Sequence, residues 1–209
     1  MSQGGLQQQS LFDGGEPRVD GTFARLRRLA LDRGAWVDHI PGWLQGHEAL
    51  LDTLWSTMQW RSERRQMYER VVDVPRLMAN VPDDGPGHPI LQEVAEALSA
   101  HYGRPLFDIS LAAYRDGRDS VAFHGDRLGI RRADAIVAIV SLGYPRRFLL
   151  RRAGGGSSRA FDLGRGDLLV MGGTCQLTWE HGVPKVAHAD LRISVQFRSG
   201  ASDEDAQTA

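Results

Sequence analysis

The sequence is poor in the residues that cross-link small proteins or span membranes. Cys175 is its single cysteine, which excludes an intramolecular disulfide and any zinc site built from several cysteines. The longest apolar run, residues 135–140, is far shorter than the roughly 20 residues that cross a bilayer. The polar, glutamine-rich residues 1–10 show no signal peptide. These absences predict a protein without a membrane partner that resides in the cytoplasm.

Lysine is nearly absent as well, since Lys185 is the only one among 25 basic residues. The 26 acidic residues leave a formal net charge of −1, which does not by itself indicate a nucleic-acid partner. Arginine gathers in the middle of the chain, and its planar guanidinium suits phosphate and carboxylate ligands. A high genomic GC content would produce the same preference for arginine, so both explanations stay open.

A chain of 209 residues, 42% hydrophobic and 24% charged, has the length and composition of one globular domain. Residues 1–20 contain several glycines and are predicted to form a flexible lead, and the acidic residues 200–209 a disordered tail. Between them, residues 21–199 are predicted to form a single domain. It divides into a helical and lid region at about 21–103 and a β-rich barrel at about 104–199.

The residue pattern changes from helical to strand-like near residue 107. Apolar residues at helical spacing predict helices over 47–60 and 89–102. From residue 107 onward, short apolar or alternating runs between glycine-bearing turns predict eight strands. They cover residues 107–114, 120–124, 135–142, 146–151, 159–163, 167–171, 175–179 and 191–198. This spacing indicates a sandwich or barrel with flanking helices, which is a mainly β fold of the α+β class.

A histidine and an aspartate stand two positions apart at the end of one predicted strand. In an extended chain, His124 and Asp126 project to the same face, so both can bind one metal ion. His181 follows another predicted strand and offers a third ligand. Two histidines and one carboxylate on one face form the facial triad of non-haem Fe(II) oxygenases. A His-x-Asp triplet alone also occurs by chance on protein surfaces.

The last predicted strand places two arginines on one face. Arg192, Ser194, Gln196 and Arg198 share that face, and apolar residues occupy the other. Two arginines that point into a barrel are costly unless they meet anions, and a dicarboxylate co-substrate supplies two carboxylates. The alternative is an edge strand whose arginines are solvated.

Six segments between residues 114 and 198 together carry a family signature. They are Tyr-Arg-Asp-Gly at 114–117, His-Gly-Asp at 124–126, Val-Ser-Leu-Gly at 140–143, Gly-Asp-Leu-Leu-Val-Met-Gly-Gly at 166–173, Glu-His-Gly-Val-Pro at 180–184 and Arg-x-x-x-x-Phe-Arg at 192–198. In this order they resemble the AlkB family of Fe(II)- and 2-oxoglutarate-dependent dioxygenases. The resemblance covers about 107–199 and implies a double-stranded β-helix, a jelly-roll or cupin-like fold.

The resemblance also implies the cofactors, which are Fe(II), the co-substrate 2-oxoglutarate and O2. It assigns the iron and the catalytic role to His124, Asp126 and His181. The residues that it places around 2-oxoglutarate are Tyr114, Arg192, Ser194 and Arg198. In this assignment the Tyr114 hydroxyl assists Arg192 at the distal carboxylate, and Arg198 lies near the carboxylate that chelates the metal.

The chain departs from the family pattern at positions that contact 2-oxoglutarate and the substrate. Ala112 and Ser194 stand where the family usually has asparagine, which weakens the expected hydrogen bonding. Arg127 follows the metal motif where many DNA-repair members have an acidic residue, near the substrate base in relatives. Further substrate contacts are predicted from Arg159, unless it is a solvated turn residue, and from Trp60, unless it packs in the core. Trp60 would stack on a flipped base.

The implied reaction is oxidative demethylation of N-alkylated nucleobases in DNA, of the 1-methyladenine and 3-methylcytosine type, with release of formaldehyde and succinate. A methylated base inside a duplex must be flipped out, so single strands are expected to serve at least as well. The same chemistry on methylated RNA, a protein side chain or a small molecule stays open. A cupin-like binding module without turnover is a third alternative, and the complete triad and arginine pair argue against it.

Residues 8–12, Gln-Gln-Ser-Leu-Phe, resemble the short peptide with which bacterial replication and repair proteins dock on the sliding clamp. Leu11 and Phe12 would enter an apolar cleft on the clamp, while Gln8 would hydrogen-bond at its rim. The alternative is that Leu11 and Phe12 fold back onto the protein. The resemblance implies a bacterial cytosol, and we expect a monomer.

Overall fold

The computed structural model describes residues 15–67, 70–81, 87–126 and 135–199. Its strands in chain order are β1 (Arg18–Val19), β2 (Arg27–Ala30), β3 (Trp36–Ile40), β4 (Leu44–Gln45), β5 (Arg61–Met67), β6 (Arg70–Asn80), β7 (Asp108–Tyr114), β8 (Val121–His124), β9 (Val137–Gly143), β10 (Arg146–Arg152), β11 (Arg159–Leu163), β12 (Asp167–Gly172), β13 (Trp179–Val183) and β14 (Arg192–Arg198). The α-helices are α1 (His47–Thr57), α2 (Pro89–Tyr102) and α3 (Cys175–Thr178), and Asp32–Gly34 forms a 3-10 turn.

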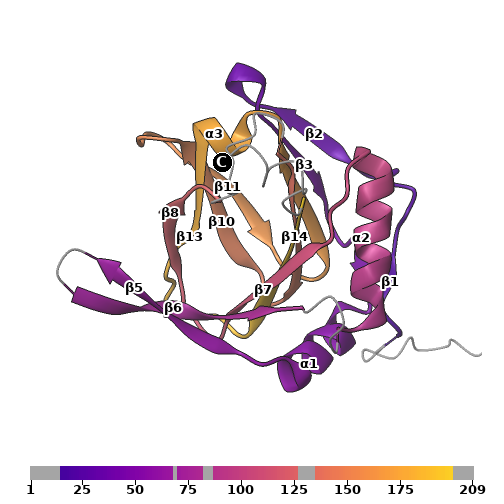
Figure 1. The fold of residues 1–209 in the computed structure, drawn as a ribbon, viewed down its shortest axis with the longest axis horizontal. Coiled ribbons are helices and arrows are strands. Elements are labelled where there is room, and N and C mark those ends of the chain that lie inside the picture. Colours follow the sequence, from indigo (N-terminus) through magenta and orange to yellow (C-terminus); the bar gives the residue numbers. More distant parts are fainter. Residues whose placement is uncertain (1–14, 68–69, 82–86, 127–134, 200–209) are drawn as a thin grey trace, which may run out of the picture.

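Two antiparallel sheets form the body of the molecule (Figure 1). The larger has the strand order β2-β3-β12-β9-β14-β7-β6-β5, and the smaller has the order β11-β10-β13-β8. From β7 to β14 successive strands of the barrel alternate between the sheets, except that β10 and β11 are neighbours in the smaller one. This is the arrangement of a double-stranded β-helix. The predicted fold class, a mainly β barrel with flanking helices, is confirmed.

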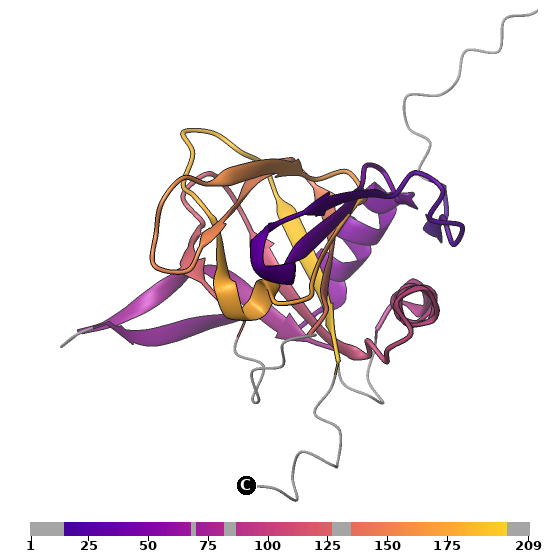
Figure 2. The ribbon, with the colours of Figure 1, turned by 90° about the horizontal axis from the view of Figure 1, so that it is seen from above.

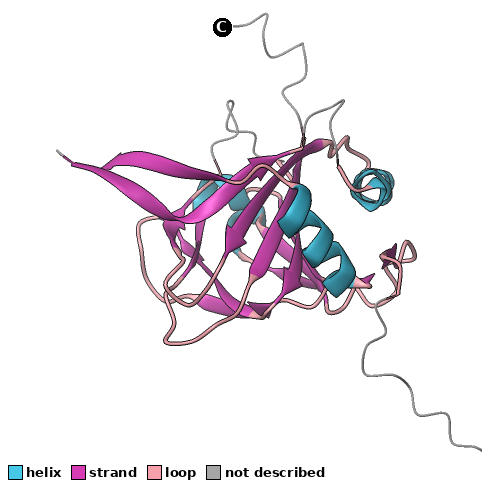
Figure 3. Ribbon diagram, turned by 90° about the horizontal axis from the view of Figure 1, so that it is seen from below, coloured by secondary structure: helices cyan, strands magenta, loops and turns pink. Residues whose placement is uncertain are grey.

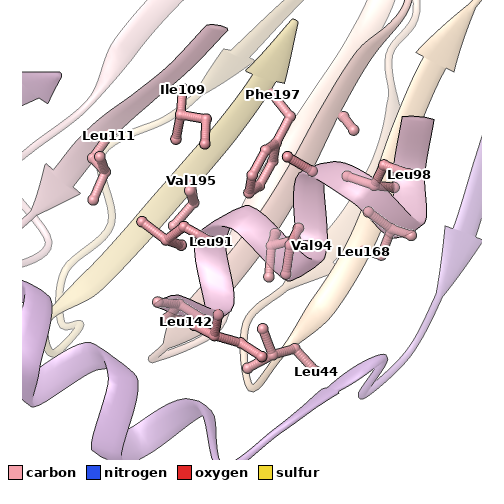
Figure 4. Close-up of a cluster of buried hydrophobic side chains, with 14 of the residues drawn as sticks. Leu44, Leu91, Val94, Leu98, Ile109, Leu111, Leu142, Leu168, Val195 and Phe197 are labelled. Atoms are coloured by element: carbon pink, nitrogen blue, oxygen red, sulfur yellow. The ribbon is translucent and has the colours of Figure 1, made fainter. Parts of the chain in front are cut away.

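Helices α1 and α2 pack against the outer face of the large sheet through apolar side chains. Along β14, Val195 and Phe197 point to α2, where Leu91, Val94 and Leu98 are buried (Figure 4). Burying one such side chain stabilises the fold by about 1.5–3 kcal/mol. Because side chains alternate along a strand, the other residues of β14 face the space between the two sheets. The outer apolar core thereby fixes which residues line the interior.

The ends of α2 agree with the sequence prediction. Pro89 occupies its first turn, and His88 Nδ1 accepts a hydrogen bond from the Ile90 amide at 3.2 Å. Gly103 follows the helix with φ of 65°, a left-handed conformation that glycine adopts without a Cβ clash. In the described part of the chain, every helix is too short or too polar to span a bilayer.

The region 21–103 differs from the predicted helical and lid region, because it also holds strands β2 to β6. Strands β2 and β3 extend the large sheet at one end, and β5 and β6 form a hairpin at the other. Strand β2 lies at a sheet edge and exposes most of its side chains, so it lacks the apolar alternation that predicts a strand. The predicted lead of residues 1–20 is also too long, since Arg18–Val19 pairs with β4.

The predicted strand 175–179 is instead the short helix α3, and the strand begins at Trp179. The chain turns at Gly173, whose φ of 61° is a left-handed conformation that glycine adopts readily. A Cβ atom at this position would clash with the backbone carbonyl oxygen of Gly34. Backbone amides of Leu177 and Thr178 then bond to the Thr174 carbonyl, which closes the helical turn. His181 therefore lies within a strand, whereas the sequence placed it after one.

Candidate metal centre and active site

Three side chains with metal-binding atoms meet between the two sheets. His124 ends β8 and lies directly opposite His181 of β13, while Asp126 follows β8 by two positions. Their ligand atoms all lie within 4.8 Å of one another. Asp126 Oδ2 is 3.9 Å from His181 Nε2, and the two imidazole centroids are 4.4 Å apart. These residues form the facial arrangement that their sequence spacing predicts.

The charge states of these groups suit a divalent cation. Burial lowers the pKa of His181 to about 4, so its imidazole is neutral at neutral pH and can coordinate a metal. Burial by itself raises the pKa of Asp126, but interactions with His181 and Arg198 outweigh it and lower the pKa. Asp126 Oδ2 is buried, and no described residue donates a hydrogen bond to it. This ionised, unpartnered oxygen beside two imidazoles fits Fe(II).

Arg198 connects Asp126 to the large sheet. Its Nη2 donates to Asp126 Oδ1 at 3.1 Å and to Gln196 Oε1 at 3.0 Å, and its Nη1 donates to Ser110 Oγ at 2.6 Å. The Ser110 hydroxyl in turn donates to Gln196 Oε1 at 3.1 Å. From α3, Gln176 Oε1 accepts the Asp126 amide at 3.3 Å. These bonds hold the carboxylate in place.

Ser110, Gln176 and Gln196 were missed as functional residues by the sequence analysis. Gln196 shares the strand face of Arg192 and Arg198, which was the one available signal. Ser110 and Gln176 belong to β7 and α3, and nothing in their own neighbourhoods in the sequence marks them. Their roles depend on which strands and helices meet in the fold.

Arg192 is buried at the opposite end of β14 from Arg198. Its Nη2 donates to Ser141 Oγ at 2.7 Å, but its Nε and Nη1 have no acceptor among the described residues. Its guanidinium carbon lies 5.2 Å from the centre of the Tyr114 ring on β7. Burial lowers the pKa of Arg192 to about 10, which leaves it charged at neutral pH. A buried guanidinium with free donors fits a carboxylate ligand.

One cavity between the sheets joins the metal-binding side chains to Arg192. It contains about 460 Å³ of space free of protein atoms, part of which is open to solvent. Its lining includes all seven side chains that the sequence analysis assigned to the metal and to 2-oxoglutarate. Phe148 of β10 also lines it and stacks on His181, with ring centroids 5.2 Å apart. The cavity therefore brings the metal-binding side chains and the residues assigned to 2-oxoglutarate into one site.

Of the predicted substrate residues that the structure describes, neither Trp60 nor Arg159 lines this cavity. Trp60 packs against Trp55, with ring centroids 5.6 Å apart, and donates its Nε1 to the Trp55 carbonyl at 3.1 Å. Trp60 is partly buried against the outer core and does not line the cavity, and its stacking on a base stays a prediction. Arg159 is exposed on β11. Leu150 of β10 lies opposite both Arg159 of β11 and His181 of β13, so these residues are on the same face of the smaller sheet. Arg127 lies outside the described residues.

The fold and the cavity together define an iron- and 2-oxoglutarate-dependent oxygenase. The sequence profile of the 2OG-Fe(II) oxygenase superfamily matches residues 52–198, and the chain belongs to this superfamily. Membership of this superfamily implies Fe(II), 2-oxoglutarate and O2 as the cofactors. The triad and Arg192 carry the donor atoms that these groups require.

Relatives within this superfamily are AlkB homologues, which confirms the resemblance to the AlkB family. The chain is 25% identical over 183 residues to human alpha-ketoglutarate-dependent dioxygenase alkB homolog 3, covering 76% of this chain and 64% of that protein. It is 30% identical over 135 residues to DNA oxidative demethylase ALKBH2 of Arabidopsis thaliana, covering 53% and 43%. The match thus spans less than two thirds of either relative's length.

Solved structures agree on the fold. The structure of OsALKBH1 superposes with a TM-score of 0.60 at 15% sequence identity, covering 83% of this chain and 100% of that one. A prolyl hydroxylase from Trichoplax adhaerens superposes with a TM-score of 0.53 at 12% identity, covering 77% and 78%. At these identities the likeness concerns the fold alone.

Proposed function

We propose that the protein oxidatively demethylates N-alkylated nucleobases in DNA, of the 1-methyladenine and 3-methylcytosine type, and releases formaldehyde and succinate. The observation that carries the proposal is the cavity that joins the metal-binding triad to buried Arg192, in a chain of the 2OG-Fe(II) oxygenase superfamily whose relatives include AlkB homologues. A relative named as a DNA oxidative demethylase supports the choice of substrate. Methylated RNA, a protein side chain or a small molecule is the alternative substrate class.

The chain's own residues bind and orient the reactants. His124, Asp126 and His181 would hold Fe(II), and Arg198 keeps Asp126 turned toward the two imidazoles. Arg192 would bind the distal carboxylate of 2-oxoglutarate beside Tyr114. Bound iron, 2-oxoglutarate and O2 supply the oxidant that hydroxylates the methyl carbon. The hydroxymethyl group would then give up its hydroxyl proton and leave as formaldehyde, and the electron pair of the broken C–N bond returns to the ring nitrogen of the base.

The hairpin of β5 and β6 is the element that we propose for nucleic-acid binding. It continues the large sheet beyond β7, with which β6 pairs through Leu77–Asn80, and projects from the barrel (Figures 2 and 3). Figure 2 shows it extending away from α1 and α2. Its sequence is rich in arginine, which suits phosphate contacts. These arginines are Arg61, Arg64, Arg65 and Arg70.

Replacing Arg64, Arg65 and Arg70 together by glutamine is expected to weaken oligonucleotide binding. In a plot of log affinity against log salt concentration, each phosphate contact that is lost reduces the steepness of the slope by about 0.7–0.9. Fluorescence titration of a single-stranded oligonucleotide at several salt concentrations measures both effects. Arg118→Gln is the matched control, because Arg118 is exposed on the loop between β7 and β8 and pairs with Asp116. An unchanged salt dependence in the triple variant would contradict the proposal.

The experiment that tests the proposed function is a product count. The protein is loaded with Fe(II) and 2-oxoglutarate without oxygen, then exposed to oxygen with methylated DNA and RNA oligonucleotides in single- and double-stranded form. Formaldehyde equal to the succinate formed is expected with 1-methyladenine or 3-methylcytosine in DNA. Succinate without formaldehyde across the whole panel would favour a protein or small-molecule substrate.

We also propose that residues 8–12 tether the enzyme to a sliding clamp. These residues lie outside the described part of the chain, so the proposal rests on the sequence motif alone. A tether would raise the enzyme's effective concentration near newly copied DNA. A peptide of residues 1–16 is expected to bind purified clamp, and a copy with Leu11→Ala and Phe12→Ala is expected to lose that binding. Equal affinity of the two peptides would end the proposal.

A further inference from the structure

Arg76 lies beside the predicted 2-oxoglutarate residues but was assigned no role from the sequence. It stands on β6 next to Leu77, which pairs with Ala113 of β7, while Tyr114 pairs with Arg192 of β14. The register therefore places Arg76, Tyr114 and Arg192 side by side on three neighbouring strands. Arg76 Nη1 donates to the Tyr114 hydroxyl at 3.3 Å, and all three side chains line the cavity.

The cavity holds more positive than negative charge among the described residues. Arg76, Arg192 and Arg198 line it, and Asp126 is the only carboxylate in the lining. Arg198 pairs with Asp126, so Arg76 and Arg192 are left without a carboxylate in the described part of the chain. Arg76 Nε is buried and has no acceptor there either. Arg192 is buried and Arg76 is partly buried, and they lie on either side of Tyr114. Two such guanidiniums without an anion are costly, so this part of the cavity favours a ligand with negative charge.

The residues next to this pair supply few other hydrogen-bond donors. Ala112 precedes Tyr114 by two residues on the same face of β7, and it pairs with Ser194. The resemblance to the AlkB family expects asparagine at both positions. Ala112 offers no side-chain donor, and the Ser194 hydroxyl accepts from Gln196 Nε2 at 3.3 Å. The arginines and Tyr114 must therefore provide most of the binding here.

We propose that Arg76 binds the distal carboxylate of 2-oxoglutarate together with Arg192 and Tyr114, and so replaces donors that the two missing asparagines would supply. The three side chains converge from β6, β7 and β14, and a carboxylate neutralises the charge that they share. The inference rests on the co-substrate of the superfamily and is independent of the nucleobase substrate. If Arg76 instead contacts the methylated substrate, the experiment below gives a different result.

The test compares two ligands by calorimetry, with the protein loaded with Mn(II) so that no turnover occurs. One ligand is 2-oxoglutarate, and the other is 2-oxopentanoate, which lacks the distal carboxylate. Arg76→Gln is expected to weaken 2-oxoglutarate binding by about ten- to a hundredfold, the loss of one or two charge-assisted hydrogen bonds. It is expected to change 2-oxopentanoate binding by less than about twofold, because the distal contact is absent in both cases.

Two further variants control for charge and for folding. Arg76→Lys keeps the positive charge and is expected to recover part of the lost affinity for 2-oxoglutarate. Arg147→Gln removes an exposed arginine of β10 and is expected to bind both ligands as the parent does. Equal losses for both ligands in Arg76→Gln, or no loss for 2-oxoglutarate, would overturn the proposal. Unchanged 2-oxoglutarate binding with weaker oligonucleotide binding would assign Arg76 to the substrate instead.

Discussion

Turnover is expected to fall to background when any one of His124, Asp126 or His181 is replaced by alanine. Each substitution removes one of the three protein ligands that converge within 4.8 Å, and two remaining ligands do not fix an open coordination site. The measurements are succinate formation and anaerobic binding of Fe(II), with circular dichroism to verify the fold. We expect each variant to lose iron binding and succinate formation together.

Two matched variants separate loss of the metal from loss of structure. Asp126→Asn keeps the shape of the side chain and its acceptor oxygen for Arg198, but it removes the charge that a divalent cation needs. It is therefore expected to fold as the parent does and to bind iron weakly. His188→Ala removes an exposed histidine whose ring lies 6.5 Å from that of Tyr144, and full activity is expected. Near-parent succinate formation in any triad variant would refute the metal assignment.

The strands of the barrel could be predicted from the sequence because their two faces differ. In β14, apolar residues face the helices and polar residues face the cavity, so alternation alone identified both the strand and the arginine face. Strand β2 could not be found this way, because an edge strand has little buried surface to impose a pattern. Helix α3 was missed because its position depends on Gly173 packing against the Gly34 carbonyl.

The candidate site was predictable where one short segment carries several of its residues. His124 and Asp126 are two positions apart, and Arg192 and Arg198 share one strand. Arg76 instead joins the site through strand pairing with β7, 38 residues along the chain from Tyr114. No local pattern reports such pairing, since register is set by the packing of the whole sheet. The contacts of Ser110 and Gln176 could not be predicted for the same reason.

Loss of Arg192 is expected to raise the requirement for 2-oxoglutarate more than any other change outside the metal ligands. Removing one partner of a buried charge pair costs about 3–5 kcal/mol, or roughly a hundred- to several thousandfold in affinity. Arg192→Ala should therefore need far more 2-oxoglutarate for turnover, while its affinity for a methylated oligonucleotide stays close to that of the parent. Titration of both ligands measures the difference.

The stability of the free protein gives an independent check on Arg192. Without a ligand, its guanidinium is buried and has donors with no acceptor in the described part of the chain, so the folded state bears a desolvation cost. Arg192→Met keeps the volume and removes that charge, and it is expected to melt at or above the parent's temperature. The parent's melting temperature should rise when 2-oxoglutarate and Mn(II) are added, and that of Arg192→Met should rise less. An equal rise in both proteins would show that the distal carboxylate does not meet Arg192.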